Sequence, residues 1–337
     1  MKQIIECVPN YSEGRNRAVI DGIVAAIASV AGVQVLNVDP GEAANRTVVT
    51  FAGEPGPVVE AAFRGAKAAQ ALIDMRRHHG THPRIGATDV LPLVPVAGIT
   101  LEECAVLARA LAERLYRELG IPCYCYEAAA FKPARRNLAV CRAGEYEALP
   151  DKMADPARKP DFGGAYDEVA ARSGATNVGA RNFLIAVNFN LDTTSVPLAK
   201  EVACDVHEKG RKVGDTWVPG TLKGCKAIGW YIDEYGIAQV SMNITDIDAT
   251  PLHTAFEEVC RAAAARGLRV TGTEIVGLVP KRVLLEAGRF YLAKRQLPPD
   301  AGEEELLRIA VESMSLDDLR PFDPREKVIE YLLDSTR

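Results

Sequence analysis

The stretch QIIECVPNYSEGRNRAVIDGIVAAIASVAGVQVLNV, residues 3–38, decides the fold. Apolar residues alternate at its start and its end and recur every three to four positions in between, which predicts a strand, a helix and a strand. We place the strands at 3–8 and 33–38 and the helix at 15–30, with Ser12 as the signal for the helix N-terminus. The same succession returns in the second half of the chain, so the sequence predicts one folding pattern used twice.

Each half completes the same order of six elements, strand–helix–strand–strand–helix–strand. In the first half, the remaining elements are expected at 46–51, 57–73 and 90–96. In the second half, the six elements are expected at 183–189, 196–209, 227–232, 238–244, 252–266 and 269–279. This is the order of the split βαβ, or ferredoxin-like, unit. We therefore predict an α+β fold, an α/β sandwich of two duplicated ferredoxin-like βαββαβ subdomains, each with one sheet and one helical layer.

Both copies carry helical extensions. A helix at 101–119 follows the first copy, and Thr100 and Glu103 have the spacing of a capping box at its start. A further strand is expected after it, at 123–126. The second copy is expected to carry two helices, at 283–294 and 303–314.

Residues 144–182, between the two copies, are rich in glycine and proline. This composition is typical of a linker or of a loop that covers a ligand, and not of a core element. We divide the chain into an N-terminal subdomain, 1–180, which includes this linker, and a C-terminal subdomain, 181–337.

The composition excludes several classes of function. The 337 residues are 48% hydrophobic and 25% charged, with a net charge of −5, and an acidic chain lacks the basic face that nucleic acid requires. No apolar run approaches the roughly 18–20 residues that cross a bilayer, and the first ten residues predict a strand and not a secretion signal. We expect a cytoplasmic protein without membrane or nucleic-acid partners, whose eight cysteines are reduced, buried and structural.

Three of the five histidines fall in the segment His78-His79-Gly80-Thr81-His82. His78 and His82 have the spacing of two metal ligands on a helix, but Gly80 and Pro83 make a continuous helix unfavourable. A two-histidine loop site with a carboxylate and a solvated histidine loop both remain open. We favour His82 as a general acid–base, because imidazole both takes and gives a proton near neutral pH, and we expect no metal.

Charged and polar side chains at strand ends are candidates for the same site. Asp39 ends a strand just before a Pro-Gly turn, where it could orient an imidazole or serve only as a turn cap. Asn10 lies at a strand-to-helix junction, where helix capping competes with catalysis. Arg46 and Arg84 could each hold a substrate carboxylate with a planar guanidinium.

Two further segments have the composition of binding surfaces. Gly174-Ala175-Thr176, with Gly179 and Arg181, predicts a cradle of backbone N–H groups for an anion or amide. Between Lys209 and Lys226, five bases face one acid, which indicates either a site for an anionic ligand tail or a solvated loop. The chain has no phosphate-loop or dinucleotide-binding spacing, so nucleotide binding is not supported.

Several phrases together resemble the glutamate formiminotransferase family. They occur in order from about Gln3 to Leu332 and are Glu6-Cys7-Val8-Pro9-Asn10-Tyr11-Ser12-Glu13-Gly14, Asn45-Arg46-Thr47, His82-Pro83-Arg84-Ile85-Gly86-Ala87, Arg142-Ala143-Gly144-Glu145-Tyr146-Glu147 and Ile228-Gly229-Trp230-Tyr231. The resemblance implies transfer of a formimino group from N-formimino-L-glutamate to tetrahydrofolate in histidine degradation. It also implies two ferredoxin-like subdomains, ligands bound in a groove between them, and a homodimer.

The resemblance assigns roles to individual residues. It places the catalytic histidine on His82 and its partner aspartate on Asp39, with tetrahydrofolate as the co-substrate. We expect the formiminoglutamate or glutamate carboxylates to meet Arg46, Arg84 and Arg181, and we expect Asn10 to bind the substrate as well. The folate-contacting stretches fall on roughly 163–174 and 214–226, with the expected residues Gly163, Gly164, Gly174, Ala175, Thr176, Gly214, Gly220, Lys223 and Lys226.

The chain departs from the family pattern in two places. Animal relatives continue into a cyclodeaminase domain, and we expect this chain to lack that activity. Residues 163–173 are slightly longer and more acidic than their counterparts. Two other functions stay open: a related transferase that uses 5-formyltetrahydrofolate and glutamate, because donor choice rests on small differences in a pocket, and a folate- or metabolite-binding module without chemistry.

Overall fold

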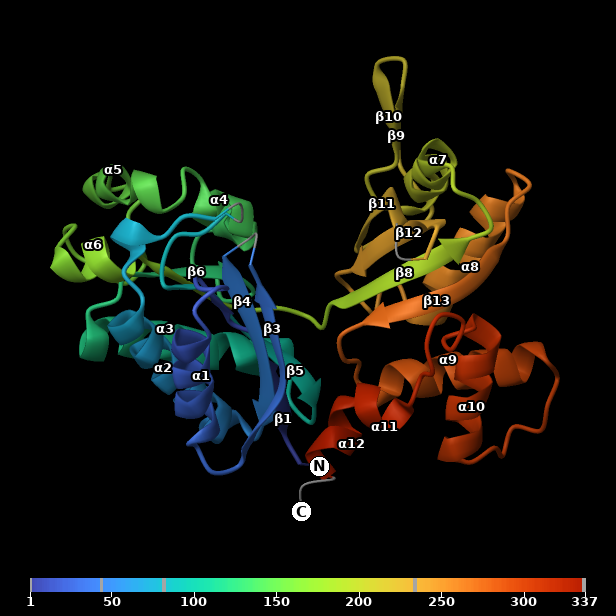
Figure 1. Cartoon of the computed structure of the whole chain (residues 1–337), viewed down its shortest axis with the longest axis horizontal. Coiled ribbons are helices and arrows are strands. Elements are labelled where there is room, and N and C mark those ends of the chain that lie inside the picture. Colours follow the sequence, from blue (N-terminus) through green and yellow to red (C-terminus); the bar gives the residue numbers. More distant parts are fainter. Residues whose placement is uncertain (1, 43–44, 81–82, 233–234, 335–337) are drawn as a thin grey trace. The chain divides into compact units, whose positions relative to one another are not determined.

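The computed structural model describes residues 2–42, 45–80, 83–232 and 235–334. Contacts divide the chain into two compact units, Met1–Arg181 (unit 1) and Asn182–Arg337 (unit 2). Each unit consists of a β-sheet covered by helices (Figure 1). Within the described ranges, no helix combines the length and apolarity that a bilayer span requires.

Unit 1 contains the predicted strand–helix–strand–strand–helix–strand core. Its elements are β1 (Ile4–Cys7), β2 (Asn10–Tyr11), α1 (Arg17–Ala28), β3 (Val33–Gly41), β4 (Arg46–Gly53), α2 (Pro55–Leu72) and β5 (Thr88–Ala97). β3 pairs with β4, β4 with β1, and β1 with β5, all antiparallel. This strand order is that of the ferredoxin-like unit, so the predicted α+β architecture is confirmed for this half.

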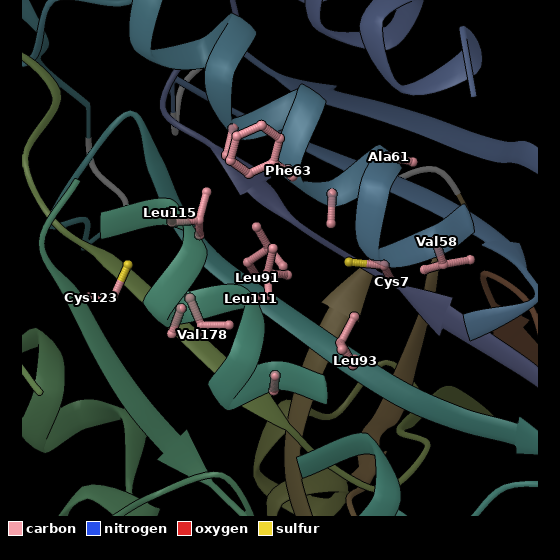
Figure 2. Close-up of a cluster of buried hydrophobic side chains, with 14 of the residues drawn as sticks. Cys7, Val58, Ala61, Phe63, Leu91, Leu93, Leu111, Leu115, Cys123 and Val178 are labelled. Atoms are coloured by element: carbon pink, nitrogen blue, oxygen red, sulfur yellow. The ribbon is translucent and has the colours of Figure 1, made fainter. Parts of the chain in front are cut away.

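The core of unit 1 lies between the sheet and its helices (Figure 2). Cys7 and Leu91 from the sheet pack with Phe63 of α2 and Leu111 of α3 (Leu101–Leu119), and these side chains are at most 6% exposed. Alternate residues of each strand point toward this layer. The residues between them, Glu6 for example, therefore point to the opposite face of the sheet.

Unit 1 extends its sheet with two more strands, β6 (Cys123–Glu127) and β7 (Thr176–Ala180). β7 is buried along its whole length and pairs in parallel with both β5 and β6. The expectation that 144–182 is only a linker or a covering loop is therefore wrong for its last part. The segment before β7 forms short helices, which are α4 (Leu138–Arg142), α5 (Leu149–Ala154) and α6 (Glu168–Ser173).

Unit 2 repeats the strand order of unit 1. Its core elements are β8 (Ile185–Leu191), α7 (Val196–Val206), β11 (Cys225–Ile232), β12 (Ile237–Ile244), α8 (Leu252–Ala264) and β13 (Val270–Val276). The order β11-β12-β8-β13 is again the ferredoxin-like one, so the predicted duplication is confirmed. The additions are an exposed hairpin, β9 (Arg211–Val213) with β10 (Thr216–Val218), and the helices α9 (Lys281–Lys294), α10 (Glu303–Met314), α11 (Pro324–Lys327) and α12 (Ile329–Asp334).

The helix N-termini test two sequence signals. The capping box of α3 is confirmed, because Thr100 Oγ1 accepts from the Glu103 N–H at 3.2 Å and Glu103 accepts from the Thr100 N–H at 2.8 Å. Ser12 is not the cap of α1. The side chain of Asn16 accepts from the Ala18 N–H, while the Ser12 hydroxyl donates to the Gly86 carbonyl at 2.7 Å.

Replacing Thr100 by Ala is expected to lower the free energy of unfolding of unit 1 by about 0.5–2 kcal/mol, because the N–H groups of the first turn of α3 lose their acceptor. Hydrogen exchange of α3 peptides in increasing urea measures the change. Thr100→Ser keeps the oxygen and is the matched control. Equal stability of the two variants would contradict a capping role.

The cysteines behave as predicted from their apolar neighbours. All eight are free thiols, six are buried, and Cys204 and Cys260 are partly buried. Burial raises the pKa of Cys125 to about 12 and that of Cys260 to about 11. These thiols therefore carry little thiolate at neutral pH and pack as small apolar side chains.

Candidate active site

The face of the unit 1 sheet opposite to its helices carries three of the predicted site residues. Asn10 of β2 pairs with Val48 of β4, and Val48 pairs with Asp39 of β3. Residues paired directly across strands point to the same face, so Asn10 and Asp39 flank Val48 in one row. Arg46, two residues before Val48, shares this face. The strand register thus brings Asn10, Asp39 and Arg46 together.

Arg46 is half-buried and lies among charged groups of both signs. Burial lowers its pKa, the neighbouring Arg142 lowers it further, and Asp89 and Asp39 oppose this. A guanidinium stays charged in proteins, so this environment leaves Arg46 as a partly desolvated cation. Arg46 and Arg142 thus lie near Asp39 and Asp89 at this end of the sheet.

Asp89 and Arg142 form a buried ion pair that sequence reasoning missed. Asp89 is 1% exposed, and both Nε and a terminal nitrogen of Arg142 donate to its carboxylate. Burial raises the pKa of Asp89, and Arg142 opposes the rise. The carboxylate also accepts from the Ile85 N–H at 3.0 Å. An aspartate at the start of the buried, apolar strand β5 is the sequence signal that could have identified it.

Arg84, which was predicted to hold a substrate carboxylate, contacts two carboxylates of its own chain. Its guanidinium is buried and pairs with Glu145 at 2.9 Å and with Glu147 at 2.7 Å. These two bonds raise the pKa of Arg84, and the pairing lowers that of Glu147. Arg84 therefore already holds two carboxylates of its own chain.

His78 is held in one neutral tautomer. Its Nε2 lies 2.8 Å from the Asn45 carbonyl oxygen, and its Nδ1 lies 3.3 Å from Nε of Arg84. Since Arg84 can only donate, Nδ1 accepts and Nε2 carries the proton. Burial lowers the pKa of His78. With both ring nitrogens of His78 engaged, the alternative of a metal site on His78 and His82 loses one of its ligands.

His82 and Thr81 lie outside the described residues, but the chain on both sides of them is firmly anchored. Before them, the Asn45 side chain donates to the His79 carbonyl at 2.9 Å. After them, the Ile85 and Ala87 N–H groups donate to Asp89 and to the Ser173 carbonyl. A polar cavity of about 420 Å³ is lined by His79, Gly80, Arg84, Gly144, Glu145 and Glu147.

Glu145 has a strained backbone. Its φ of 56° and ψ of −156° belong to a region that only glycine enters readily, and such a residue costs about 1–3 kcal/mol. Its carboxylate accepts from both the backbone N–H and the side chain of Arg84.

Arg181 lies at the end of β7, and its N–H donates to the Leu93 carbonyl at 3.2 Å. Its guanidinium acts on Glu6, which is 4% exposed and lies on the face of the sheet opposite to the helices. Burial raises the pKa of Glu6 to about 7, although Arg181 opposes the rise. Arg181 therefore lies close enough to Glu6 to lower its pKa.

The predicted anion cradle at Gly174, Ala175 and Thr176 is wrong. The Gly174, Ala175 and Thr176 N–H groups donate to the carbonyls of Ala170, Ile85 and Pro122, respectively. Ala175 and Thr176 are at most 1% exposed. Gly174 and Gly179 serve close packing, because a Cβ on either would collide with the backbone of 85–86 or with the Tyr126 ring.

The other residues expected to contact folate lie in surface segments. Gly163 and Gly164 precede α6, and Gly163 packs against Pro160. Gly214 is the open tip of the β9–β10 hairpin, whereas Gly220 packs tightly on the His207 backbone. Lys223 and Lys226 are exposed. Of the other bases in this segment, Arg211 pairs with Glu201 and Asp205, and Lys209 lies 4.5 Å from the Trp217 ring centre.

Comparison with known proteins covers almost the whole chain. Residues 4–181 match the formiminotransferase domain, N-terminal subdomain, and residues 186–334 match the formiminotransferase domain. The formimidoyltransferase-cyclodeaminase of Sus scrofa is 49% identical over 333 residues, which are 99% of this chain and 60% of that protein. The chain therefore spans about three fifths of that relative.

Shorter relatives are matched over most of their own length. The glutamate formimidoyltransferase of Streptococcus pyogenes serotype M1 is 42% identical over 292 residues, 87% of this chain and 94% of that protein. That of Thermoplasma acidophilum is 41% identical over 291 residues, 86% of this chain and 92% of that protein. The chain thus belongs to the formiminotransferase family.

Proposed function

We propose that this protein transfers the formimino group of N-formimino-L-glutamate to tetrahydrofolate, giving 5-formimino-tetrahydrofolate and L-glutamate, in histidine degradation. The observation that carries the proposal is the match of both formiminotransferase models over residues 4–181 and 186–334. The face of the unit 1 sheet opposite to its helices, with Asp39 and Arg46, supplies groups suited to a substrate that carries an amidinium and two carboxylates.

The reaction needs a proton to be taken from the attacking nitrogen and a proton to be given to the leaving nitrogen. N5 of tetrahydrofolate attacks the formimino carbon and forms a C–N bond, and the attacking nitrogen loses its proton. The tetrahedral intermediate then breaks its bond to the glutamate nitrogen, which leaves as an amine and takes up a proton. His82 is assigned both transfers, as base and then as acid. Asp39 orients the imidazole or balances the cationic amidinium.

Positioning residues surround this chemistry. Arg46 is a partly desolvated guanidinium that suits a glutamate carboxylate, and Asn10 stands in the same row of the sheet as Asp39. Arg84, after release from Glu145 and Glu147, and Arg181 are further candidates for holding the substrate carboxylates. Folate is assigned to the surface segments that contain Gly163, Gly164, Gly214, Gly220, Lys223 and Lys226.

One assay tests the reaction directly. The protein is incubated with tetrahydrofolate and formiminoglutamate, and 5-formimino-tetrahydrofolate is followed by mass spectrometry. A parallel reaction with 5-formyltetrahydrofolate and L-glutamate separates the two donor types. Product only in the second reaction would replace the proposed donor, and binding without product in either would leave a ligand-binding module. We also propose a cytoplasmic homodimer, which light scattering of the purified chain tests for its subunit number.

The double substitution Lys223→Gln/Lys226→Gln is expected to weaken the binding of polyglutamylated tetrahydrofolate more than that of the monoglutamate. The reason is that each pair of an exposed lysine and a carboxylate of the glutamate tail contributes about 0.2–1 kcal/mol. Calorimetric titration with both folates at low salt measures the difference, which should shrink as salt is added. Lys67→Gln/Lys200→Gln removes two exposed lysines elsewhere and is the matched control. Equal losses for the two folates would rule out binding of the tail here.

A further inference from the structure

Arg84 is a buried cation whose two partners are open to solvent. Its side chain is 9% exposed, whereas those of Glu145 and Glu147 are 41% and 63% exposed. Nη1 of Arg84 donates to both carboxylates at 2.9 Å, and Nη2 donates to Glu147 at 2.7 Å. All three side chains line the cavity of about 420 Å³. A molecule that enters this cavity meets a guanidinium covered by two glutamate carboxylates.

Breaking these ion pairs costs Arg84 more free energy than it costs the two glutamates. A buried guanidinium needs an anionic partner, whereas a carboxylate that is largely in water loses little when it is released. Arg84 also donates from Nε to His78 Nδ1 and from Nη2 to the His78 carbonyl, at 3.3 and 3.4 Å. These two bonds keep the guanidinium in place without the glutamates. Replacing one carboxylate by another therefore costs little.

The backbone at Glu145 favours release as well. Glu145 stands in the conformation that suits glycine, directly after Gly144, whose φ is 75°. Its bonds to Arg84 help to hold it there, and the loss of these bonds lets the backbone relax to an ordinary conformation. Glu145, the partner of Arg84 that has a strained backbone, is thus also accessible to solvent.

We propose that the carboxylates of Glu145 and Glu147 occupy the position on Arg84 that a carboxylate of the amino-acid substrate takes when it binds. A carboxylate of a glutamate-type ligand enters the cavity, displaces them from Arg84 and takes over the guanidinium. The chain's own glutamates then act as a built-in competitor that weakens binding of the donor and of the L-glutamate product. The inference rests on the proposed function, because it takes the ligand to be glutamate or its formimino derivative.

The test uses L-glutamate as the probe and the full chain as the protein, without folate or turnover. Glu145→Gln/Glu147→Gln removes both charges and keeps the side-chain shape. We expect L-glutamate to bind about 2- to 10-fold more tightly to this variant by calorimetry, the size of effect that two partly exposed ion pairs have. Because Arg84 then lacks an anionic partner, we expect the Tm of this variant to fall, and binding is measured well below that temperature.

Two further variants separate exchange from a general effect of charge. Glu113→Gln removes an exposed carboxylate of α3 that lies 4.0 Å from Arg117, and it should leave L-glutamate binding unchanged. Arg84→Lys keeps the charge but loses the planar fork. In that background, Glu145→Gln/Glu147→Gln should no longer improve the affinity.

Two results would overturn the inference. Weaker or equal binding of L-glutamate to Glu145→Gln/Glu147→Gln would mean that the glutamates only hold the loop. An improvement that persists with Arg84→Lys would mean that bulk charge is responsible. The proposed function fails separately: tighter L-glutamate binding as predicted, in a protein that makes no 5-formimino-tetrahydrofolate, would end the proposed reaction and leave the exchange standing.

Discussion

Replacing His82 by Ala is expected to lower kcat by about 10²–10⁴, the contribution typical of general acid–base catalysis, while tetrahydrofolate still binds. The reason is that attack of N5 and departure of the glutamate nitrogen each depend on a proton transfer, and both transfers are assigned to one imidazole. Quench-flow or steady-state formation of 5-formimino-tetrahydrofolate measures the loss, and calorimetry measures folate binding.

Two comparisons sharpen this experiment. His79→Ala changes the neighbouring histidine, whose carbonyl and not its ring is bonded by Asn45, and a much smaller loss is expected. Added imidazole should restore part of the activity of His82→Ala, because it replaces the missing proton carrier. Equal losses at both positions, or full activity without His82, would end the assignment.

Replacing Asp161 by Ala is expected to destabilise unit 1 by about 3–5 kcal/mol, the cost of leaving a buried charge without its partner. Asp161 and Arg135 are each 6% exposed in their side chains and lie 2.5 Å apart. The Asp161 carboxylate also accepts from the Cys125 N–H at 2.8 Å. The substitution therefore leaves two buried donors, the Arg135 guanidinium and the Cys125 N–H, without this acceptor. No other described carboxylate pairs with Arg135.

The measurement must report on unit 1. Both tryptophans, Trp217 and Trp230, belong to unit 2, so their fluorescence follows the other half of the molecule. Hydrogen exchange of β6 and β7 peptides in urea is the suitable probe. Asp21→Ala breaks the exposed pair with Arg17, and it should change stability by less than about 1 kcal/mol. If Asp161→Ala lowered the stability no more than Asp21→Ala does, the buried pair would contribute little.

The regular elements could be predicted from the sequence because their apolar residues repeat with a clear period. The helix at 101–119 and the helix at 303–314 were placed with their observed bounds. β7 was missed because Thr176-Asn177-Val178-Gly179-Ala180 contains one β-branched apolar residue and small residues otherwise. Those small residues are needed because strands β5 and β6 and the Tyr126 ring close around it, and this crowding is a tertiary property.

The site was only partly predictable for a similar reason. Local patterns identified Asp39 and Arg46 as charged residues at strand ends, and the strand register then placed them on one face. The partners of Arg84, by contrast, lie 61 and 63 positions further along the chain. A sequence pattern shows a cation but not the carboxylates that reach it. Ser12 was misassigned because its hydroxyl bonds to Gly86, 74 positions away.

The position of β7 has a consequence for synthesis of the chain. β5 and β6 do not pair with each other; β7 lies between them, bonded in parallel to both. Residues 98–175 must therefore leave the ribosome before the strand that joins β5 to β6 appears. Until then each of these strands presents an unpaired edge, which is where nascent chains associate wrongly. Unit 1 can complete its sheet only when Ala180 emerges, so its folding waits for its last strand.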